Sequence, residues 1–289
     1  MQSPIIGSEA LATGVLTRGQ LRWNYRPIFP DVHVLKGQRL TLRIRTLGAW
    51  MWSGRRAIIA GQAAAALHGA EWVSEQAPIE LVYGCGRPPA GIVARNERIE
   101  ADEIVVRDGM LVTSGVRTAL DLGRYLKRDA AVIHLDDLAR AVEVQRDPIL
   151  ELAQRYSGAR GVARAATAIH LMDAGSESPK ESELRLILID AGLPRPRTQI
   201  RVSEGSRVAF IDMGWDEPMV GLDYEGDHHR RERPTYVTDI GRYEMIERQG
   251  WNDLRVVAEH SPSFIVYRVI EAFGLRDWKY RRNRRRKCA

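Results

Sequence analysis

Apolar and polar residues alternate on both sides of a turn signal in the segment VAFIDMGWDEPMVGLDYEGDHH, residues 208–229. A period of two predicts β-strands, and the Pro-containing stretch WDEP predicts the turn that joins them. A turn centred between Glu217 and Pro218 pairs the two strands symmetrically. We therefore expect a β-hairpin at this point of the chain.

Carboxylates lie at matching positions of this hairpin. Symmetric pairing sets Asp212 opposite Asp223, and alternation places Glu225 on the same face as Asp223. Like charges across a sheet repel each other, so the patch is stable only if it is well solvated, partly protonated or neutralised by a cation. A divalent ion is the simplest of these solutions. We predict that Asp212, Asp223 and Glu225 bind Mg²⁺ or Mn²⁺.

Glu181 is a fourth acidic candidate. Apolar spacing from Leu184 and Leu188 predicts a helix and puts Glu181 beside its buried stripe, where a carboxylate would point inward. The same residue also follows Ser178 by three positions, with proline between them, which is the pattern of a capping box. Both interpretations of Glu181 stay open.

The N-terminal pattern predicts a small basic unit. Residues 8–25 form two short helices broken at Gly14, and the second would expose Arg18 and Arg22. The segment IFPDVHVLKG follows as a hairpin that carries Lys36. Two short helices and a basic wing suggest a winged helix-turn-helix, although a small packing subdomain has the same pattern.

The middle of the chain changes period twice. Residues 78–113 alternate with a period of two and predict a mainly antiparallel sheet, whereas residues 114–172 predict helices. In these helices we expect Asp136 and Asp137 to be solvated. The expected fold class is α+β, with domains at residues 1–75 (winged helix), 76–175 (β then α) and 176–289 (an α/β core and a basic tail).

Charge is concentrated at the two ends. The formal net charge is +6, but residues 1–60 carry +7 and residues 276–289 another +7, which leaves −8 between them. Arginine and lysine neutralise phosphates, so we expect any nucleic-acid contact to use these ends. Tail candidates are Arg281, Arg282, Arg284 and Arg285. A basic tail is equally typical of a disordered solubilising extension.

Other sequence features narrow the class of protein. No apolar run reaches the ~18 residues of a membrane helix, and the first residues lack the pattern of a signal peptide. We expect a cytoplasmic protein without membrane contact. The two cysteines, Cys85 and Cys288, are too far apart in sequence to indicate a zinc motif or a disulfide framework.

About the last 110 residues resemble the endonuclease-like domains related to very-short-patch-repair (Vsr) endonucleases. The matching residues are Glu181, Asp212, Asp223, Glu225 and His229, followed by Asp239, Arg242 and Gly250-Trp251. The resemblance implies a restriction-endonuclease-like core in which these four acids and the histidine are the catalytic residues. The chain departs from the pattern in two respects. The chain has Asp-x-Glu-Gly where Glu-x-Asp-Gly is usual, and the second strand lacks the lysine of the broader superfamily.

The segments LTRGQLR, VHVLKG and GQAAAALHG resemble the N-terminal part of AbiEi-type antitoxins. This resemblance covers roughly residues 5–75. It implies a DNA-binding regulator whose partner is a nucleotidyltransferase-like toxin.

Two functions follow from the sequence. One is a metal-dependent DNA endonuclease, in which His229 orients or deprotonates the attacking water. The other is a non-catalytic DNA-binding regulator, or the antitoxin of a type IV toxin–antitoxin pair, that uses a degenerate nuclease fold. Retention of the acids and the histidine favours the enzyme, whereas the exchanged carboxylates and the missing lysine favour the regulator.

Overall fold

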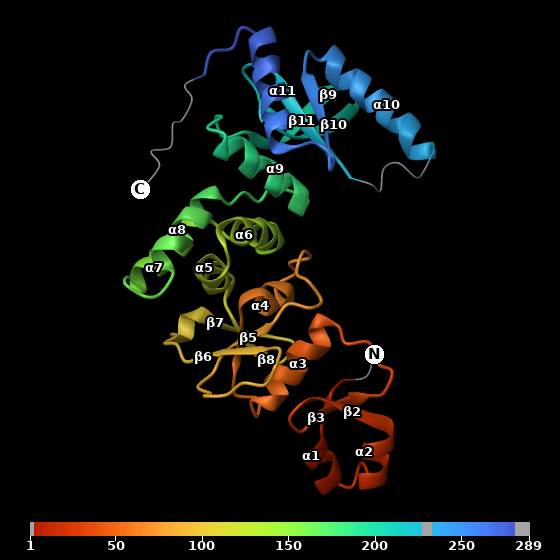
Figure 1. The fold of residues 1–289 in the computed structure, drawn as a ribbon, viewed down its shortest axis with the longest axis vertical. Helices are drawn as coiled ribbons and strands as arrows, with labels where there is room; N and C mark the ends of the chain where they lie inside the picture. The colour runs from red at the N-terminus through yellow and green to blue at the C-terminus, as the bar shows by residue number, and fades with distance from the viewer. Residues whose placement is uncertain (1–2, 227–232, 281–289) are drawn as a thin grey trace. The chain divides into compact units, whose positions relative to one another are not determined.

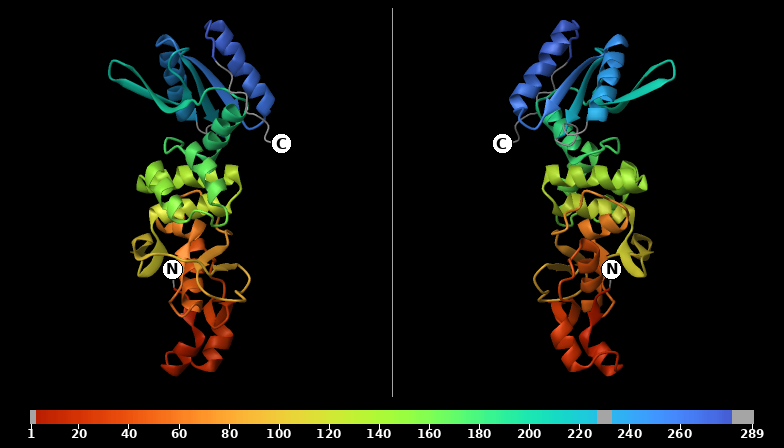
Figure 2. Two further views of the ribbon diagram at one scale, coloured as in Figure 1. Left: turned by 90° about the vertical axis from the view of Figure 1, so that its left-hand side faces the viewer. Right: turned by 90° about the vertical axis from the view of Figure 1, so that its right-hand side faces the viewer.

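The computed structural model describes residues 3–226 and 233–280, and it shows the expected α+β class. The chain divides into two compact units, Met1–Ala174 and Gly175–Ala289. Figures 1 and 2 show the elements of each unit.

The first unit begins with a small three-stranded sheet in the order β1-β3-β2. Its elements are β1 (Ile5–Ile6), α1 (Gly7–Ala12), α2 (Arg18–Asn24), β2 (Tyr25–Phe29) and β3 (Val32–Leu35). Helix α2 begins at a reciprocal cap, in which the Gln20 N–H donates to Thr17 Oγ1 at 3.2 Å and the Thr17 N–H donates to Gln20 Oε1 at 2.8 Å. This cap explains why a helix of only two turns starts at this point.

A five-stranded sheet follows, in the order β6-β5-β4-β8-β7. Its elements, with the intervening helices, are α3 (Leu42–Trp52), β4 (Ile58–Ala60), α4 (Gly61–Leu67), β5 (Ile79–Val82), β6 (Ile92–Arg95), β7 (Ile104–Arg107) and β8 (Met110–Thr113). The sheet is mixed and not mainly antiparallel as expected: β4 pairs antiparallel with β5, and β7 with β8, but the other two strand pairs are parallel. Strand β4 enters the centre of the sheet and runs parallel to β8, and β5 runs parallel to β6. A three-residue strand leaves too little alternation to be recognised in sequence.

One hydrophobic core joins the small sheet to the larger one. It extends from Phe29 and Val32 through Ile59 and Ile79 to Val112. Residues on both sides of position 75 therefore pack into the same core.

Helices complete the first unit. They are α5 (Gly115–Tyr125), α6 (Arg128–Val142), α7 (Arg146–Arg155) and α8 (Val162–Leu171). The expected solvation of Asp136 and Asp137 is wrong, since both side chains are fully buried. The Asp137 carboxylate accepts the N–H groups of Glu71 at 3.0 Å and Trp72 at 2.7 Å. Both carboxylates therefore bind distant backbone groups that a helical pattern alone does not predict.

The second unit has the order helix, three antiparallel strands, helix, parallel strand, helix. Its elements are α9 (Pro179–Asp190), β9 (Arg197–Glu204), β10 (Arg207–Trp215), β11 (Val220–Glu225), α10 (Arg233–Arg248), β12 (Asn252–Val257) and α11 (Pro262–Leu275). The sheet order is β12-β11-β10-β9, with β11 and β12 parallel and the other neighbours antiparallel. Helix α10 covers one face, and α9 and α11 cover the other (Figure 1).

Two clusters of apolar side chains fill the two faces of this sheet. Leu222 and Val256 pack with Phe273 of α11, and the Phe273 ring meets that of Trp215 edge to face at a centroid distance of 4.8 Å. On the other face, Ile211 packs with Ile246 of α10. Figure 2 shows the β9–β10 hairpin extending beyond the helices of this unit. Among the described residues, no helix is both long enough and apolar enough to cross a lipid bilayer.

Candidate functional site

The site is built on the β10–β11 hairpin. Trp215 pairs with Val220, Gly214 with Gly221 and Met213 with Leu222, which is the symmetric register expected from the turn. The expectation of a hairpin with this register is confirmed. Continuing it by one residue brings Asp212 opposite Asp223.

Asp212 and Asp223 bind each other's strands. The Asp212 N–H donates to Asp223 Oδ1 at 2.9 Å, and the Tyr224 N–H donates to Asp212 Oδ2 at 2.7 Å. Ile211 belongs to the apolar cluster under α10, whereas Met213 belongs to the cluster on the opposite face. The chain therefore changes face at Asp212, and the two carboxylates replace the backbone pairing at this point.

The environment of the two aspartates disfavours a second negative charge. The Asp223 side chain is buried, with Oδ2 at 2.6 Å from the Arg242 guanidinium of α10. Burial, followed by the charges of Asp223 and Glu181, raises the pKa of Asp212 to about 8. In the metal-free protein Arg242 balances one carboxylate, and Asp212 retains its proton near neutral pH.

Glu181 lies in the first turn of α9, but its carboxylate does not complete the capping box considered from the sequence. Ser178 caps α9 by accepting the Glu181 N–H at 3.2 Å, and Glu181 Oε2 accepts the Glu177 N–H at 2.8 Å. The side chain is also buried, and burial raises its pKa. Its charge reaches Asp212, whose pKa it raises. Ser178 is therefore the cap of α9, whereas Glu181 binds the residue before that cap and contributes negative charge to the site.

Glu225 lies at the open end of the same strand. The Tyr243 hydroxyl donates to Glu225 Oε1 at 3.3 Å, and Arg255 Nε lies 3.4 Å from the same oxygen. The Arg255 guanidinium stacks on the Tyr243 ring, with its carbon 3.4 Å from the ring centroid. One side chain of α10, Tyr243, and one of β12, Arg255, thus meet at this carboxylate.

Sequence reasoning missed Asp253. It lies on β12 beside Gly221 of β11, on the face that also carries Asp223. Neither carboxylate oxygen has a hydrogen-bond partner among the described residues, and both are buried. Burial, followed by the charge of Asp223, raises the pKa of Asp253 to about 7. The available signal was its place directly before the apolar run that predicts the last strand.

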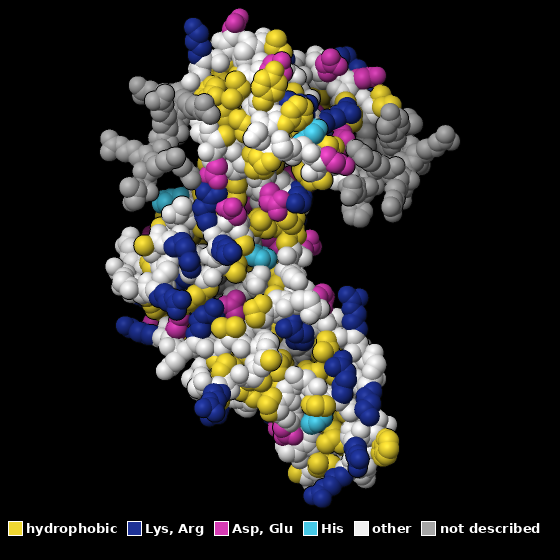
Figure 3. All heavy atoms as spheres, in the orientation of Figure 1, with side chains coloured by type: hydrophobic (Ala, Val, Ile, Leu, Met, Phe, Trp, Pro, Cys, Tyr) yellow, Lys and Arg dark blue, Asp and Glu magenta, His cyan; other side chains and the backbone are white. Residues whose placement is uncertain are grey.

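The basic candidates of the first unit are all exposed. Arg18 and Arg22 project from α2, and Lys36 follows β3 and donates from Nζ to the Arg22 carbonyl at 3.0 Å. Trp23 is also 72% exposed on α2. Figure 3 shows Lys and Arg side chains gathered along one side of this N-terminal part.

Several predicted residues lie outside the part that the structure describes. They are His229, Arg281, Arg282, Arg284 and Arg285. Among the residues whose side chains the structure describes, 3–226 and 240–280, no group of three or more His, Cys, Asp or Glu side chains is arranged to hold a metal ion.

Comparison with known proteins identifies two similar chains, both from Mycobacterium tuberculosis. The uncharacterized proteins MT2308 of strain CDC 1551 / Oshkosh and Rv2248 of strain H37Rv are each 28% identical to this chain over 234 residues. Each alignment covers 80% of this chain and 85% of the relative. No family model matches the chain, and no solved structure matches it.

Proposed function

We propose that the second unit is a divalent-metal-dependent nuclease domain acting on DNA. The observation that carries this proposal is the pair formed by the half-buried Asp212 and the buried Asp223 on adjoining strands, with a third carboxylate, Asp253, on the neighbouring strand. Carboxylates clustered away from solvent lower the stability of a fold, so a protein that keeps them is expected to use them for a function. A helix before the β10–β11 hairpin, and a helix, a strand and a terminal helix after it, support the proposed restriction-endonuclease-like core, although β9 adds a strand that the sequence did not predict.

The donor set suits Mg²⁺ or Mn²⁺. These ions prefer oxygen ligands, and Mg²⁺ commonly takes one or two protein carboxylates and keeps several waters. Asp212 and Asp223 would supply those carboxylates, and Glu225 lies on the same face. When bound, the cation polarises the scissile phosphate and lowers the pKa of a coordinated water.

Protein side chains have their own tasks in this proposal. Arg242 neutralises Asp223 in the metal-free protein and is positioned to pair with the substrate phosphate once a cation occupies the carboxylates. Tyr243 and Arg255 hold Glu225 in place. His229, as the proposed proton acceptor, follows β11 within the segment outside the described residues.

The N-terminal elements support binding to DNA through a winged helix-turn-helix. Helix α2 presents Arg18, Arg22 and Trp23 to solvent, and the β2–β3 hairpin leads into Lys36 beside it. A short exposed helix next to a basic hairpin is the arrangement with which such domains contact the major groove and the backbone.

A second function is favoured by one specific observation. Arg242 already occupies the position on Asp223 where a cation would bind. Such an ion pair suits a domain that has lost metal-dependent activity. On this alternative the protein is a DNA-binding regulator, or an antitoxin whose partner is a nucleotidyltransferase-like toxin.

Metal binding and plasmid cleavage separate the two functions. We expect Mg²⁺ or Mn²⁺ to raise the melting temperature of the wild type. At a metal concentration of 100 Kd the free energy of unfolding should increase by ~2.7 kcal/mol. Wild type should also nick supercoiled plasmid. Asp212→Asn and Asp223→Asn should abolish the metal-linked rise and lower nicking at least ~100-fold, since even residues that only support metal ligands cost 10–100-fold.

The matched control is Asp216→Asn, at the exposed turn of the same hairpin. It should retain both metal binding and nicking. If wild type shows neither a metal-linked rise nor nicking, while still binding DNA, the nuclease proposal is wrong and the regulator remains.

A further inference from the structure

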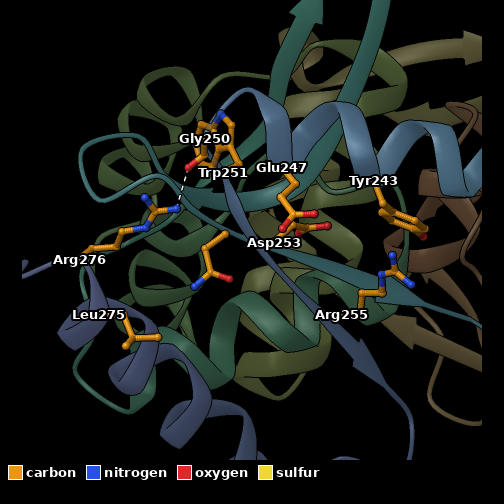
Figure 4. Close-up of a pocket in the computed structure, with 9 residues that line it drawn as sticks. Tyr243, Glu247, Gly250, Trp251, Asp253, Arg255, Leu275 and Arg276 are labelled. Atoms are coloured by element: carbon orange, nitrogen blue, oxygen red, sulfur yellow. Dashed lines mark hydrogen bonds between the residues drawn. The ribbon is translucent and has the colours of Figure 1, made fainter.

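A pocket of 490 Å³ opens beside the carboxylates of the second unit (Figure 4). It is formed by α10, the start of β12 and the end of α11. The lining residues include Tyr243 and Glu247 of α10 and Asn252 and Arg255 of β12. Arg276, the residue that follows α11, also lines the pocket. The volume lies within the range of ~300–1,000 Å³ that is typical of small-molecule sites.

Two polar side chains of this pocket are available to a ligand. In the described part of the chain, neither the Glu247 carboxylate nor the Asn252 amide has a hydrogen-bond or ion-pair partner. Figure 4 shows Glu247 and Asp253 among the residues that line the pocket. A carboxylate accepts hydrogen bonds only, whereas an amide both donates and accepts. The pocket wall therefore includes both hydrogen-bond donors and acceptors.

Cationic and aromatic groups occupy the rest of the wall. Arg255 lies flat on the Tyr243 ring, and Arg276 donates to the Gly250 carbonyl at 2.7 Å (Figure 4). A guanidinium stacked on a ring provides a flat surface on which a nucleobase can stack. Guanidinium groups at the rim also attract phosphate.

The pocket shares a wall with the candidate metal site. Arg255 pairs with Asp223 across the parallel strands, and its Nε lies 3.4 Å from Glu225. Asp253 lines the pocket and neighbours Asp223 on the same face. A nucleic-acid strand whose phosphate lies at Asp212 and Asp223 would thus bring an adjacent nucleotide to the pocket.

We propose that this pocket binds one unstacked nucleobase that carries an exocyclic amino group, namely adenine, cytosine or guanine. The inference rests on the proposed nucleic-acid function of the same unit. Glu247 accepts hydrogen bonds from the amino group, and Asn252 pairs with the adjoining ring edge. Thymine presents carbonyl oxygens at this position, and these are repelled by an acceptor-only carboxylate.

Single-stranded homo-oligomers test the base preference. The full-length protein is titrated against fluorescently labelled oligo(dA), oligo(dC) and oligo(dT) in buffer with EDTA, so that binding is measured without cleavage. We expect wild type to bind oligo(dA) and oligo(dC) about tenfold more tightly than oligo(dT). Glu247→Gln adds a donor at the same position and should reduce this ratio to about twofold or less. Asn252→Ala should weaken binding to the amino-bearing oligomers.

The control is Glu271→Gln, which removes an exposed carboxylate from α11 outside the pocket and should keep the tenfold ratio. Equal affinities of wild type for the three oligomers, or an unchanged ratio in Glu247→Gln, would overturn the proposal. Its failure is distinct from that of the nuclease. If the protein does not nick plasmid but prefers the amino-bearing oligomers, the base-binding proposal holds and the nuclease proposal fails. If it nicks plasmid without any base preference, the nuclease proposal holds and the base-binding proposal fails.

Discussion

At the scale of single residues, Asp212 shows the cost of the carboxylate cluster most directly. Its pKa of about 8 lies far above the ordinary value of 3.8, because the side chain loses much of its contact with solvent and lies near the charges of Asp223 and Glu181. The folded protein therefore keeps a proton that the unfolded chain loses near pH 4. Stability from this group is complete below that pH and is lost as the pH rises through about 8.

Asp212→Asn should remove this loss of stability at rising pH. The asparagine Oδ1 can still accept the Tyr224 N–H, but no charge develops. One pKa unit corresponds to ~1.4 kcal/mol. As the pH rises from 5 to 8, the free energy of unfolding of the variant should therefore increase by about 2 to 4 kcal/mol relative to that of the metal-free wild type. Urea unfolding with EDTA at both pH values measures the change. Asp216→Asn is the control and should show a much smaller change. A difference independent of pH would mean that Asp212 is ionised throughout.

At the scale of elements, the β10–β11 hairpin depends on two facing glycines. A Cβ atom at Gly214 would lie 2.3 Å from the Val220 carbonyl oxygen and 2.9 Å from the Gly221 Cα. Both are backbone atoms of the partner strand, so a side chain there must push the strands apart. The pair lies two residues from each aspartate, which links hairpin geometry to the site.

Gly214→Ala should therefore destabilise the second unit by ~1–3 kcal/mol, the usual cost of overpacking. It should also weaken metal binding, because separated strands hold Asp212 and Asp223 less closely. Gly241→Ala on α10 is the control. A Cβ there meets nothing within 4 Å, so the higher helix propensity of alanine should stabilise by up to ~1 kcal/mol. Calorimetry and chemical denaturation compare the two. A fully stable Gly214→Ala protein would contradict the close approach of these strands.

At the scale of the whole chain, the two compact units meet in sequence at Ala174 and Gly175. Each has cores of its own: the first unit contains the one from Phe29 to Val112, and the second contains one on each face of its sheet. A separate core allows a unit to fold by itself.

Limited proteolysis should therefore cut between Gly175 and Lys180 and leave a compact C-terminal fragment. Mass spectrometry identifies the cut, and calorimetry of the fragment should show one cooperative transition. Its metal-linked rise in melting temperature should equal that of the full chain, because both aspartates lie in this unit. Resistance of this stretch, with cuts elsewhere, would remove the boundary.

Local chemistry accounts for what the sequence by itself determined. The register of Asp212 and Asp223 followed from a period of two and one proline-containing turn, and the cap at Ser178 followed from residue spacing. Both features depend on hydrogen bonds or contacts between residues that are close in sequence. Hence composition and order were sufficient to predict the hairpin, α9 and the α+β class.

Pairing between distant segments was decided only by the tertiary structure. The parallel register of β11 and β12 brings Asp253 beside Asp223, and α10 supplies Arg242 as the partner of that carboxylate. The buried Asp136 and Asp137 bind backbone groups of other segments, although their helix suggests an exposed pair. Periodicity records which face of an element is apolar, but it does not record which distant group will meet a polar side chain. For that reason the pocket beside the carboxylates, and its unpartnered Glu247 and Asn252, were visible only in the folded chain.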